Sequence, residues 1–535
     1  MNKRPFVIFL LALCFSTLRA STFEIDGIWY EITSDQTVRV VPETSATDGS
    51  GTFIIFNYPY EGDITIPATI TYESKDYTVT AAKAGTFQES SNLTSVSIPA
   101  TLTDLGEAPF ASCIKLTTIT VAEDNPAYSV IDGLLYNKTA TTLFACPGAK
   151  EGAITVKDGV TIIGKSAFHG CSKLTSIEMP ASVQEIGAEA FRGCKLLTTI
   201  NLPDGITVLD NRVFYNCHAL SSISLPDGIT SIGSNAFYQC SSLSSITLPT
   251  SLQVLGEYAF SLCGGLRSVT LPAGLKEIGY RAFENCYRIS TISIPASVTT
   301  IATMAFCGCS NLRSIDVAAN NTAYSSQDGV LFNKTKTTLL CCPSAKSSTY
   351  TVPATVNTIG EYGFYACKSL VSITLPYSLT ILRPYSFRLC SNLKTIALPP
   401  SVSQVGRNSF SGCNALESIL VYSRDVPNTD AATFTTNNLN VPVYVPAESL
   451  ESYQSADNWK EFTTILPISA DIVDGNLGDV NNDGQVNVSD IMTIVNVILG
   501  SPTSTYYRWQ MGDLNFDGRT NVSDIMKIVG LILNN

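Results

Sequence analysis

Residues 190–212 read AFRGCKLLTTINLPDGITVLDNR, and residues 213–235 read VFYNCHALSSISLPDGITSIGSN. Both segments are 23 residues long and place phenylalanine, cysteine, leucine, isoleucine and proline at the same positions. The unit, AFxxCxxLxxIxLPxxVxxIG, recurs along most of the chain. Its phenylalanines include Phe110, Phe168, Phe191, Phe214, Phe237, Phe260, Phe283, Phe306, Phe364, Phe387 and Phe410. A unit this short cannot enclose a core alone, so the repeat predicts a solenoid in which each coil packs on its neighbours.

Each part of the unit predicts a local conformation. Alternating apolar residues in LxxIxL favour a short strand with its apolar side inward, and the following proline ends that strand. Turn pairs such as Asp204-Gly205 come next, VxxIG predicts a second extended segment, and AFxxC predicts a brief helical turn with its phenylalanine inside. The expected fold class is therefore mainly β, a solenoid of 23-residue coils with short parallel strands, followed by a small all-α C-terminal domain.

Two insertions interrupt the repeat, over about residues 122–156 and 318–352. They resemble each other, with NPAYSVIDGLLYNKT starting at Asn125 and NTAYSSQDGVLFNKT starting at Asn321. We expect each insertion to add an imperfect coil that contains one turn at Asp-Gly and one at Asn-Lys-Thr.

The composition and the first residues indicate export. The chain has 535 residues, 45% of them hydrophobic, and a formal net charge of −12, which disfavours nucleic acid and anionic lipid as partners. Residues 1–20 have a basic start, an apolar run from Phe6 to Phe15 and small residues at the end, which predicts a signal peptide cleaved before Ser21. Lipidation at Cys14 is disfavoured because Leu13 stands where a small residue is needed. No later stretch is apolar for long enough to predict a membrane span.

The cysteines follow the repeat at constant phase, from Cys113 to Cys413. Export would permit disulfides, but one cysteine per coil favours a column of small, buried, unpaired residues. Cys307, Cys341 and Cys342 depart from this pattern, so we expect them to be the more reactive thiols. Two histidines in the whole chain exclude a histidine-rich metal site.

Two surfaces of the coil could contact a partner. The central exposed position of LxxIxL is serine or threonine in nearly every copy, which favours a solubilising face and leaves weak glycan or protein contact as the alternative. Variation gathers around AFxxC, where tyrosine and arginine are enriched, as they are at interface anchors. A merely tolerant surface is an equally good interpretation. The candidate partner-binding residues are Tyr215, Tyr238, Tyr258, Tyr280, Arg281, Tyr287, Arg288, Tyr385 and Arg388.

The C-terminal residues contain two copies of a metal-loop pattern. GDVNNDGQVNVSDIM starts at Gly478 and GDLNFDGRTNVSDIM at Gly512, each with oxygen ligands at loop positions 1, 3, 5 and 12 and glycine at position 6. This spacing predicts calcium binding, with the backbone carbonyl of position 7 as a further ligand and two ions in all. The expected ligands are Asp479, Asn481, Asp483, Gln485 and Asp490 in the first loop, and Asp513, Asn515, Asp517, Arg519 and Asp524 in the second.

The repeat unit resembles the BspA-like leucine-rich repeats of exported proteins from gut and oral bacteria. FEIDGIWY from Phe23 is similar to the N-terminal cap of such proteins, and VPVYVPAESLESYQSADNWKEF from Val441 is similar to their closing segment. The resemblance implies a leucine-rich-repeat solenoid on a secreted or cell-surface binding protein, often one that adheres to host proteins. It carries over no catalytic residues.

Residues 478–535 resemble a dockerin, because position 12 of each loop is aspartate and one helix follows each loop. The resemblance implies docking to a cohesin-type partner. Positions 10 and 11 govern partner choice in dockerins; here they are Val488-Ser489 and Val522-Ser523, identical in the two copies. Their identity implies two binding orientations related by a half turn.

These interpretations divide the chain into regions. We expect a signal peptide over 1–20, an N-terminal β cap over 21–84, the solenoid over 85–424, a C-terminal cap over 425–470, a linker over 471–477 and the dockerin-like domain over 478–535. The expected function is non-catalytic binding or adhesion, because the repeated Ser/Thr faces offer no pair of carboxylates across a cleft as a glycosidase requires. The alternatives are a component of a polysaccharide-degrading complex and a purely structural scaffold.

Overall fold

The computed structural model describes residues 22–42, 60–430, 432–434, 439–469, 477–481, 483, 485–499, 509–515 and 517–534. The expected signal peptide lies outside these residues. The chain forms two compact units, one of residues 1–151 and 163–172 and the other of residues 152–162 and 173–535. The division falls within and just after the first insertion, and each unit is described by itself.

The first unit begins with a five-stranded cap sheet in the order β1-β2-β3-β6-β5. Its strands are β1 (Thr22–Ile25), β2 (Ile28–Ile32), β3 (Thr37–Val40), β5 (Thr69–Tyr72) and β6 (Lys75–Ala82). The β1–β2 hairpin closes through Asp26 and Gly27, whose φ angles of 50° and 77° suit a two-residue turn between antiparallel strands. The core of this unit contains Tyr30, Val38 and Val79, each at most 1% exposed.

The first coils follow the cap sheet in the same unit. A parallel sheet joins β4 (Gly62–Thr65), β7 (Leu93–Ile98) and β8 (Thr118–Val121). Ser95 pairs with Thr118 at the centre of this sheet, so the expected hydroxyl column is present. Two further strands, β12 (Glu151–Thr155) and β13 (Ile162–Ile163), lie where the units meet in sequence.

Each insertion forms an antiparallel meander of three strands, and its last strand joins the parallel row of the coils that follow. The first contains β9 (Tyr128–Ile131), β10 (Leu134–Asn137) and β11 (Thr142–Ala145), and the second β26 (Tyr324–Gln327), β27 (Val330–Asn333) and β28 (Thr338–Cys341). Both expected turns are present, but the two-residue turn at Asp132-Gly133 (φ 53° and 75°) reverses the chain at once. Each insertion is therefore an imperfect coil, as expected, in which the tight turns add two antiparallel strands before the strand that stacks on the next coil.

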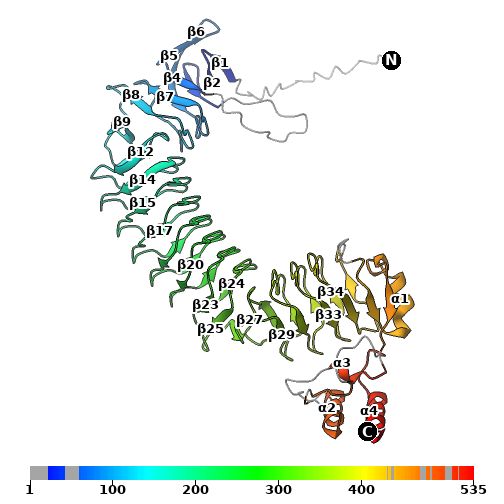
Figure 1. Cartoon of the computed structure of the whole chain (residues 1–535). Helices are drawn as coiled ribbons and strands as arrows, with labels where there is room; N and C mark the ends of the chain where they lie inside the picture. Colours follow the sequence, from blue (N-terminus) through cyan, green and yellow to red (C-terminus); the bar gives the residue numbers. More distant parts are fainter. Residues whose placement is uncertain are drawn as a thin grey trace, which may run out of the picture. The chain divides into compact units, whose positions relative to one another are not determined.

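In the second unit the coils stack in register through two rows of parallel strands (Figure 1). Val208 pairs with Ser231, which pairs with Val254, each pair 23 residues apart. The VxxIG segment is thus a strand, as predicted. One row contains β15 (Glu185–Ile186), β17 (Val208–Leu209), β18 (Ser231–Ile232), β20 (Val254–Leu255), β22 (Glu277–Ile278), β24 (Thr300–Ile301), β30 (Thr358–Ile359), β32 (Ile381–Leu382), β34 (Gln404–Val405) and β36 (Asn428–Thr429). The other row contains β14 (Lys173–Glu178), β16 (Thr199–Ile200), β19 (Ile246–Thr247), β21 (Val269–Thr270), β23 (Thr291–Ile294), β25 (Ser314–Val317), β29 (Thr349–Thr351), β31 (Ser372–Thr374), β33 (Thr395–Leu398), β35 (Ser418–Val421), β37 (Val443–Val445) and β38 (Ile465–Pro467).

The AFxxC segments are hydrogen-bonded turns, and the prediction of a helical turn is wrong. The residues two before and two after Phe237, Asn235 and Gln239, have φ angles of 59° and 61°. Left-handed residues at this spacing prevent a right-handed helix from continuing. The phenylalanine nevertheless points inward as expected: Phe237 and Phe260 are fully buried and stack with their ring centroids 5.2 Å apart.

The cysteine column is buried and unpaired. None of the fifteen cysteines in the described residues forms a disulfide. Most copies also donate the thiol hydrogen to the phenylalanine carbonyl oxygen of the preceding coil, as Cys240 does to Phe214 at 3.2 Å. The sequence pattern predicted the burial but not this hydrogen bond.

Short helices end the second unit. The closing segment contains η1 (Ala447–Ser449), α1 (Leu450–Ser455) and η2 (Trp459–Glu461), with Tyr453 and Trp459 fully buried. The C-terminal residues contain α2 (Val488–Ile498), α3 (Trp509–Gly512) and α4 (Val522–Asn534), and α2 contacts α4. The sequence predicted a helix after each loop but not α3. Among the described residues, no helix has the length and apolar content that crossing a lipid bilayer requires.

Candidate functional site

The first C-terminal loop gathers three carboxylates. One oxygen from each of Asp479, Asp483 and Asp490 lies within 4.8 Å of the others, and Asp479 and Asp490 are 3% and 0% exposed. The backbone N–H of Asp483 donates to Asp479 Oδ1 (3.1 Å), which folds the loop around the cluster. Three carboxylates this close repel one another unless a cation lies between them, and an all-oxygen set suits a hard divalent ion such as Ca²⁺.

Asp490, at position 12, also closes the first loop. Its Oδ1 accepts from the backbone N–H groups of Val480 (2.9 Å) and Asn481 (3.1 Å), and its Oδ2 accepts from Asn487 (2.9 Å). The Asn487 side chain in turn accepts from the backbone N–H of Ser489, which caps α2. The residue expected to bind the ion thus also fixes the start of the helix that follows the loop.

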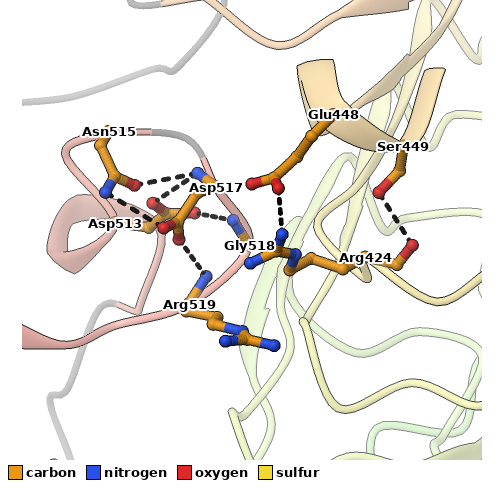
Figure 2. A network of polar contacts seen from close by, with 8 residues as sticks. All are labelled: Arg424, Glu448, Ser449, Asp513, Asn515, Asp517, Gly518 and Arg519. Carbon is orange, nitrogen blue, oxygen red and sulfur yellow. Dashed lines mark hydrogen bonds and ion pairs between the residues drawn. The ribbon is translucent and has the colours of Figure 1, made fainter.

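The second loop repeats this arrangement, with one difference (Figure 2). Asp524 accepts from the backbone N–H groups of Leu514 and Asn521, both at 2.9 Å, and Asp517 donates its N–H to Asp513 Oδ1 at 3.1 Å. Asp513 is only 1% exposed, and this burial raises the pKa of its carboxyl to about 7. Within the described part of the chain, the 4.8 Å convergence of three carboxylates occurs in the first loop alone.

The remaining expected ligands lie in the same loops. Asn481 and Asn515 donate their side-chain amides to Asp483 (3.0 Å) and Asp517 (3.2 Å). At position 7, the backbone N–H groups of Gln485 and Arg519 donate to the same two carboxylates, each at 2.9 Å. All ten expected ligands therefore lie in the two loops, five in each, and their donor set fits calcium.

The residues at positions 10 and 11 are on the surface. Val488 is 62% exposed and Val522 is 64% exposed, and Ser489 and Ser523 are also exposed. One turn further along each helix lie two methionines that we did not predict, Met492 and Met526, which are 54% and 64% exposed. Each methionine follows its valine by four residues, a spacing that places both side chains on the same face of a helix, and the sequence could have revealed this pairing. Each helix therefore presents a matching exposed apolar stripe next to its loop.

The tyrosines and arginines beside the AFxxC turns form contacts among themselves. Tyr215 and Tyr238 stack at 4.7 Å, and the Arg281 guanidinium lies 5.8 Å from the Tyr258 ring centroid and 5.1 Å from the Tyr280 centroid. Arg388 lies over Tyr385 in the same manner at 5.5 Å. Because these groups are half-buried against one another, part of their surface is already used within the solenoid.

Two of the nine candidates lie elsewhere. Tyr287 and Arg288 follow Cys286 on a different turn, and both are exposed. Tyr362, another tyrosine beside an AFxxC turn that is not among the nine candidates, stacks on Tyr385 at 4.8 Å.

The expectation of reactive thiols at Cys307, Cys341 and Cys342 is not supported. Cys307 and Cys342 are buried, and Cys341 is half-buried. Burial raises the pKa of Cys307 and Cys341 above the ordinary thiol range, so little of the reactive thiolate forms at neutral pH. Cys307 and Cys341 line a cavity of about 130 Å³ together with Met304, Tyr362 and Tyr365.

Comparisons with solved structures return bacterial repeat proteins. A leucine-rich repeat protein from Bacteroides ovatus is 25% identical, with 84% of this chain and 100% of that chain covered and a TM-score of 0.39. A leucine-rich cell surface protein from Faecalibacterium prausnitzii is 23% identical, with 84% and 96% covered and a TM-score of 0.39. The pneumococcal vaccine antigen PcpA is 18% identical, with 84% and 99% covered and a TM-score of 0.40. No curated protein matches this chain.

Two family models match the sequence, and neither describes a family of enzymes. The model of the dockerin type I domain matches residues 477–533. The model of the BspA type leucine rich repeat region matches residues 67–144, 141–254, 230–344 and 341–454, which is most of the chain. The chain therefore belongs to the BspA type leucine-rich repeat family and ends in a dockerin type I domain.

Proposed function

We propose that this protein is an exported, non-catalytic binding protein. Its solenoid contacts a host protein or glycan, while its C-terminal domain docks to a cohesin-type partner when calcium is bound. The observation that carries this proposal is the pair of oxygen-lined loops, each next to an exposed stripe of the same residues. Calcium would order each loop through its carboxylates and so fix the helix that carries the stripe.

The residue assignments follow the two loops. Asp479, Asn481, Asp483, Asp490 and the Gln485 carbonyl would hold one ion, and Asp513, Asn515, Asp517, Asp524 and the Arg519 carbonyl a second. Val488-Ser489 and Val522-Ser523 would contact the cohesin, with Met492 and Met526 extending the apolar contact. An exposed apolar stripe bordered by polar residues is typical of a protein-binding surface.

We propose that the ligand of the solenoid binds to a set of tyrosine and arginine side chains. These are Tyr215, Tyr238, Tyr258, Tyr280, Arg281, Tyr287, Arg288, Tyr385 and Arg388. Tyr287, at 45% exposed, is the most accessible of the tyrosines in this set. The domain limits proposed from sequence, with a signal peptide over 1–20, caps over 21–84 and 425–470 and a linker over 471–477, belong to the same proposal.

A second candidate function is a role in a polysaccharide-degrading complex, which the dockerin domain favours by association. In that case the solenoid would bind glycan or act as a scaffold while other subunits catalyse hydrolysis.

A pull-down with the full chain tests the proposal. Cohesin-type domains immobilised on resin should capture the chain when calcium is present at about 1 mM, which matches the weaker dissociation constants of extracellular calcium-binding modules. Addition of EGTA should release the chain. Glycan and extracellular-matrix arrays then separate the adhesin from the scaffold. Capture that is unaffected by EGTA would contradict the calcium-dependent docking.

A further inference from the structure

The outward face of the solenoid changes character near its C-terminal end. In β29 and β31 the outward residues Thr351 and Thr374 pair with each other, in keeping with the hydroxyl face of earlier coils. The equivalent position then becomes Ala397, which pairs with Leu420, which pairs with Tyr444. We call Ala397, Leu420 and Tyr444 the apolar column. An apolar column on an otherwise hydroxyl-bearing face indicates that something covers it.

The C-terminal domain covers the apolar column. Leu420 is 7% exposed and the next outward residue, Tyr422, is fully buried, although the inward positions beside them, Ile419 and Val421, already fill the solenoid core. Leu420 and Tyr422 belong to one hydrophobic cluster with residues of the C-terminal domain. The other buried members of this cluster are Ile468, Val480, Ile494, Met511, Leu514 and Ile528.

The second calcium loop approaches the solenoid backbone closely. A Cβ on Gly518 would lie 2.4 Å from the backbone oxygen of Tyr422 and 3.0 Å from Arg424 Cγ, so only glycine allows this contact. Arg424 is held in place by an ion pair with Glu448 and by the Ser449 hydroxyl, which donates to the Arg424 carbonyl oxygen at 2.8 Å (Figure 2). The glycine at loop position 6 therefore has two roles here, since it turns the loop (φ 76°) and lets the loop lie against the residues that directly follow β35.

Charge explains why this contact would depend on calcium. The second loop brings Asp513, Asp517 and Asp524 to a buried surface, with Asp513 1% and Asp524 0% exposed. Burying uncompensated carboxylates against an apolar face is unfavourable, and a divalent cation among them removes most of that penalty. The second loop meets Tyr422 through the backbone of Gly518, whereas the described first-loop residues that join the cluster are the apolar side chains of Val480 and Val486.

We infer that the outward face of the last coils, β33 to β37, is a docking surface for the second calcium loop of the same chain, occupied when that loop holds calcium. The inference rests on the calcium part of the proposed function, but not on the cohesin or the solenoid ligand. Docked in this way, the domain leaves both Val488 and Val522 exposed, so cohesin docking and solenoid docking use different surfaces.

Hydrogen exchange on the full chain tests the inference. We compare Asp513→Asn in the second loop with the matched variant Asp479→Asn in the first, both in calcium. Asp513→Asn should speed amide exchange over residues 418–424 about tenfold, the change expected when a local opening loses about 1.4 kcal/mol. Asp479→Asn should leave that segment unchanged. Equal exchange in the two variants, while calorimetric titration shows that each has lost one calcium, overturns the inference.

A second pair of variants keeps the ligands intact. Leu420→Lys should undock the loop, so that the C-terminal domain becomes sensitive to protease in calcium, while Thr351→Lys at the corresponding position of an earlier coil should not. Both variants should still bind two calcium ions. If Leu420→Lys resists protease like the parent chain, the docking surface is wrong even though calcium binding stands. If the parent chain takes up no calcium, both the proposed calcium role and the calcium dependence of docking fall.

Discussion

The thiol of Cys240 donates a hydrogen bond to the backbone carbonyl oxygen of Phe214, 3.2 Å away in the preceding coil. The same relationship joins Cys217 to Phe191, Cys263 to Phe237 and Cys286 to Phe260, each at 3.1 Å. One cysteine per coil thus fills a small space in the interior. Its thiol also adds a second hydrogen bond to a carbonyl that already accepts a backbone N–H within its own turn, as Phe214 does from Cys217 at 3.2 Å.

Replacing one of these cysteines should destabilise the solenoid. We expect Cys240→Ala to lower the free energy of unfolding by about 1–3 kcal/mol, because it removes a buried sulfur and one of the two hydrogen bonds to the Phe214 carbonyl oxygen. Ser241→Ala, at the exposed neighbouring position, is the control. Urea unfolding followed by circular dichroism measures both, and equal midpoints would show that the thiol contributes nothing.

The same column should make the solenoid sensitive to alkaline pH. Burial raises the pKa of Cys217 and Cys263 to about 12, whereas an unfolded thiol titrates near 8.5. The folded state therefore holds its protons more tightly, so stability is constant below the unfolded pKa and falls as pH rises from about 8.5 towards 12. Thermal unfolding between pH 7 and 11 measures this fall. A thiol reagent at pH 8 should label the native chain slowly and the denatured chain fully.

Removing the amide of Asn321 should weaken the second insertion. Its side chain is fully buried, donates to the carbonyl oxygens of Pro295 and Val298 at 2.9 Å each, and accepts from the backbone of Ala323 and Tyr324. We expect Asn321→Ala to cost about 3 kcal/mol, since several buried groups lose their partners. The exposed neighbour Asn320→Ala gives a matched control, and a similar loss in both variants would contradict the prediction.

Calcium should stabilise the C-terminal domain. Ligand at 100 times its dissociation constant adds about 2.7 kcal/mol to the stability of the state that binds it, so EGTA should lower the melting temperature of residues 478–535. Differential scanning calorimetry of the full chain with calcium, with EGTA and with EGTA plus magnesium separates this effect from ionic strength. A transition of the domain that does not move with EGTA would contradict the calcium sites.

The two docking stripes should substitute for each other. Val488→Asp or Val522→Asp alone should weaken cohesin binding only about twofold, because one of two equivalent orientations is lost. A twofold change in affinity corresponds to about 0.4 kcal/mol of binding free energy. The double variant should abolish binding. Surface plasmon resonance against immobilised cohesin measures all three, and a large loss from one single variant would show that only one orientation is used.

The repeat was predictable because one short sequence pattern determines each coil and recurs many times along the chain. The spacing of Phe191 and Phe214 alone sets the coil length, and proline after LxxIxL marks each strand end. The AFxxC turn was misjudged because copies such as the one with Gln239 carry no glycine at the left-handed position. Other copies do have a glycine there, such as Gly193 and Gly308, and this signal was not used. The two turns of each insertion were predicted correctly, but the antiparallel pairing that such tight turns impose was not foreseen.

The metal loops were predictable for a different reason. Calcium ligands have a fixed spacing within a single loop, so residues from Asp479 to Asp490 suffice. Contacts between distant segments carry no such pattern, which is why the approach of Gly518 to Tyr422 and the stacking of Tyr362 on Tyr385 were not foreseen. The apolar residues at Leu420 and Tyr444 were visible in the sequence, but their meaning depends on knowing which face of the strand they occupy.

The constant strand register of the second unit has a consequence for how such a chain changes length. Because Val208, Ser231, Val254 and Glu277 pair at a fixed offset of 23 residues, joining Cys217 directly to Ser241 would fuse two equivalent points of neighbouring coils. Every later side chain would keep its orientation. Gene segments that encode whole coils can therefore be deleted or duplicated in evolution, and in the laboratory, to alter the extent of the binding surface without redesigning its interior.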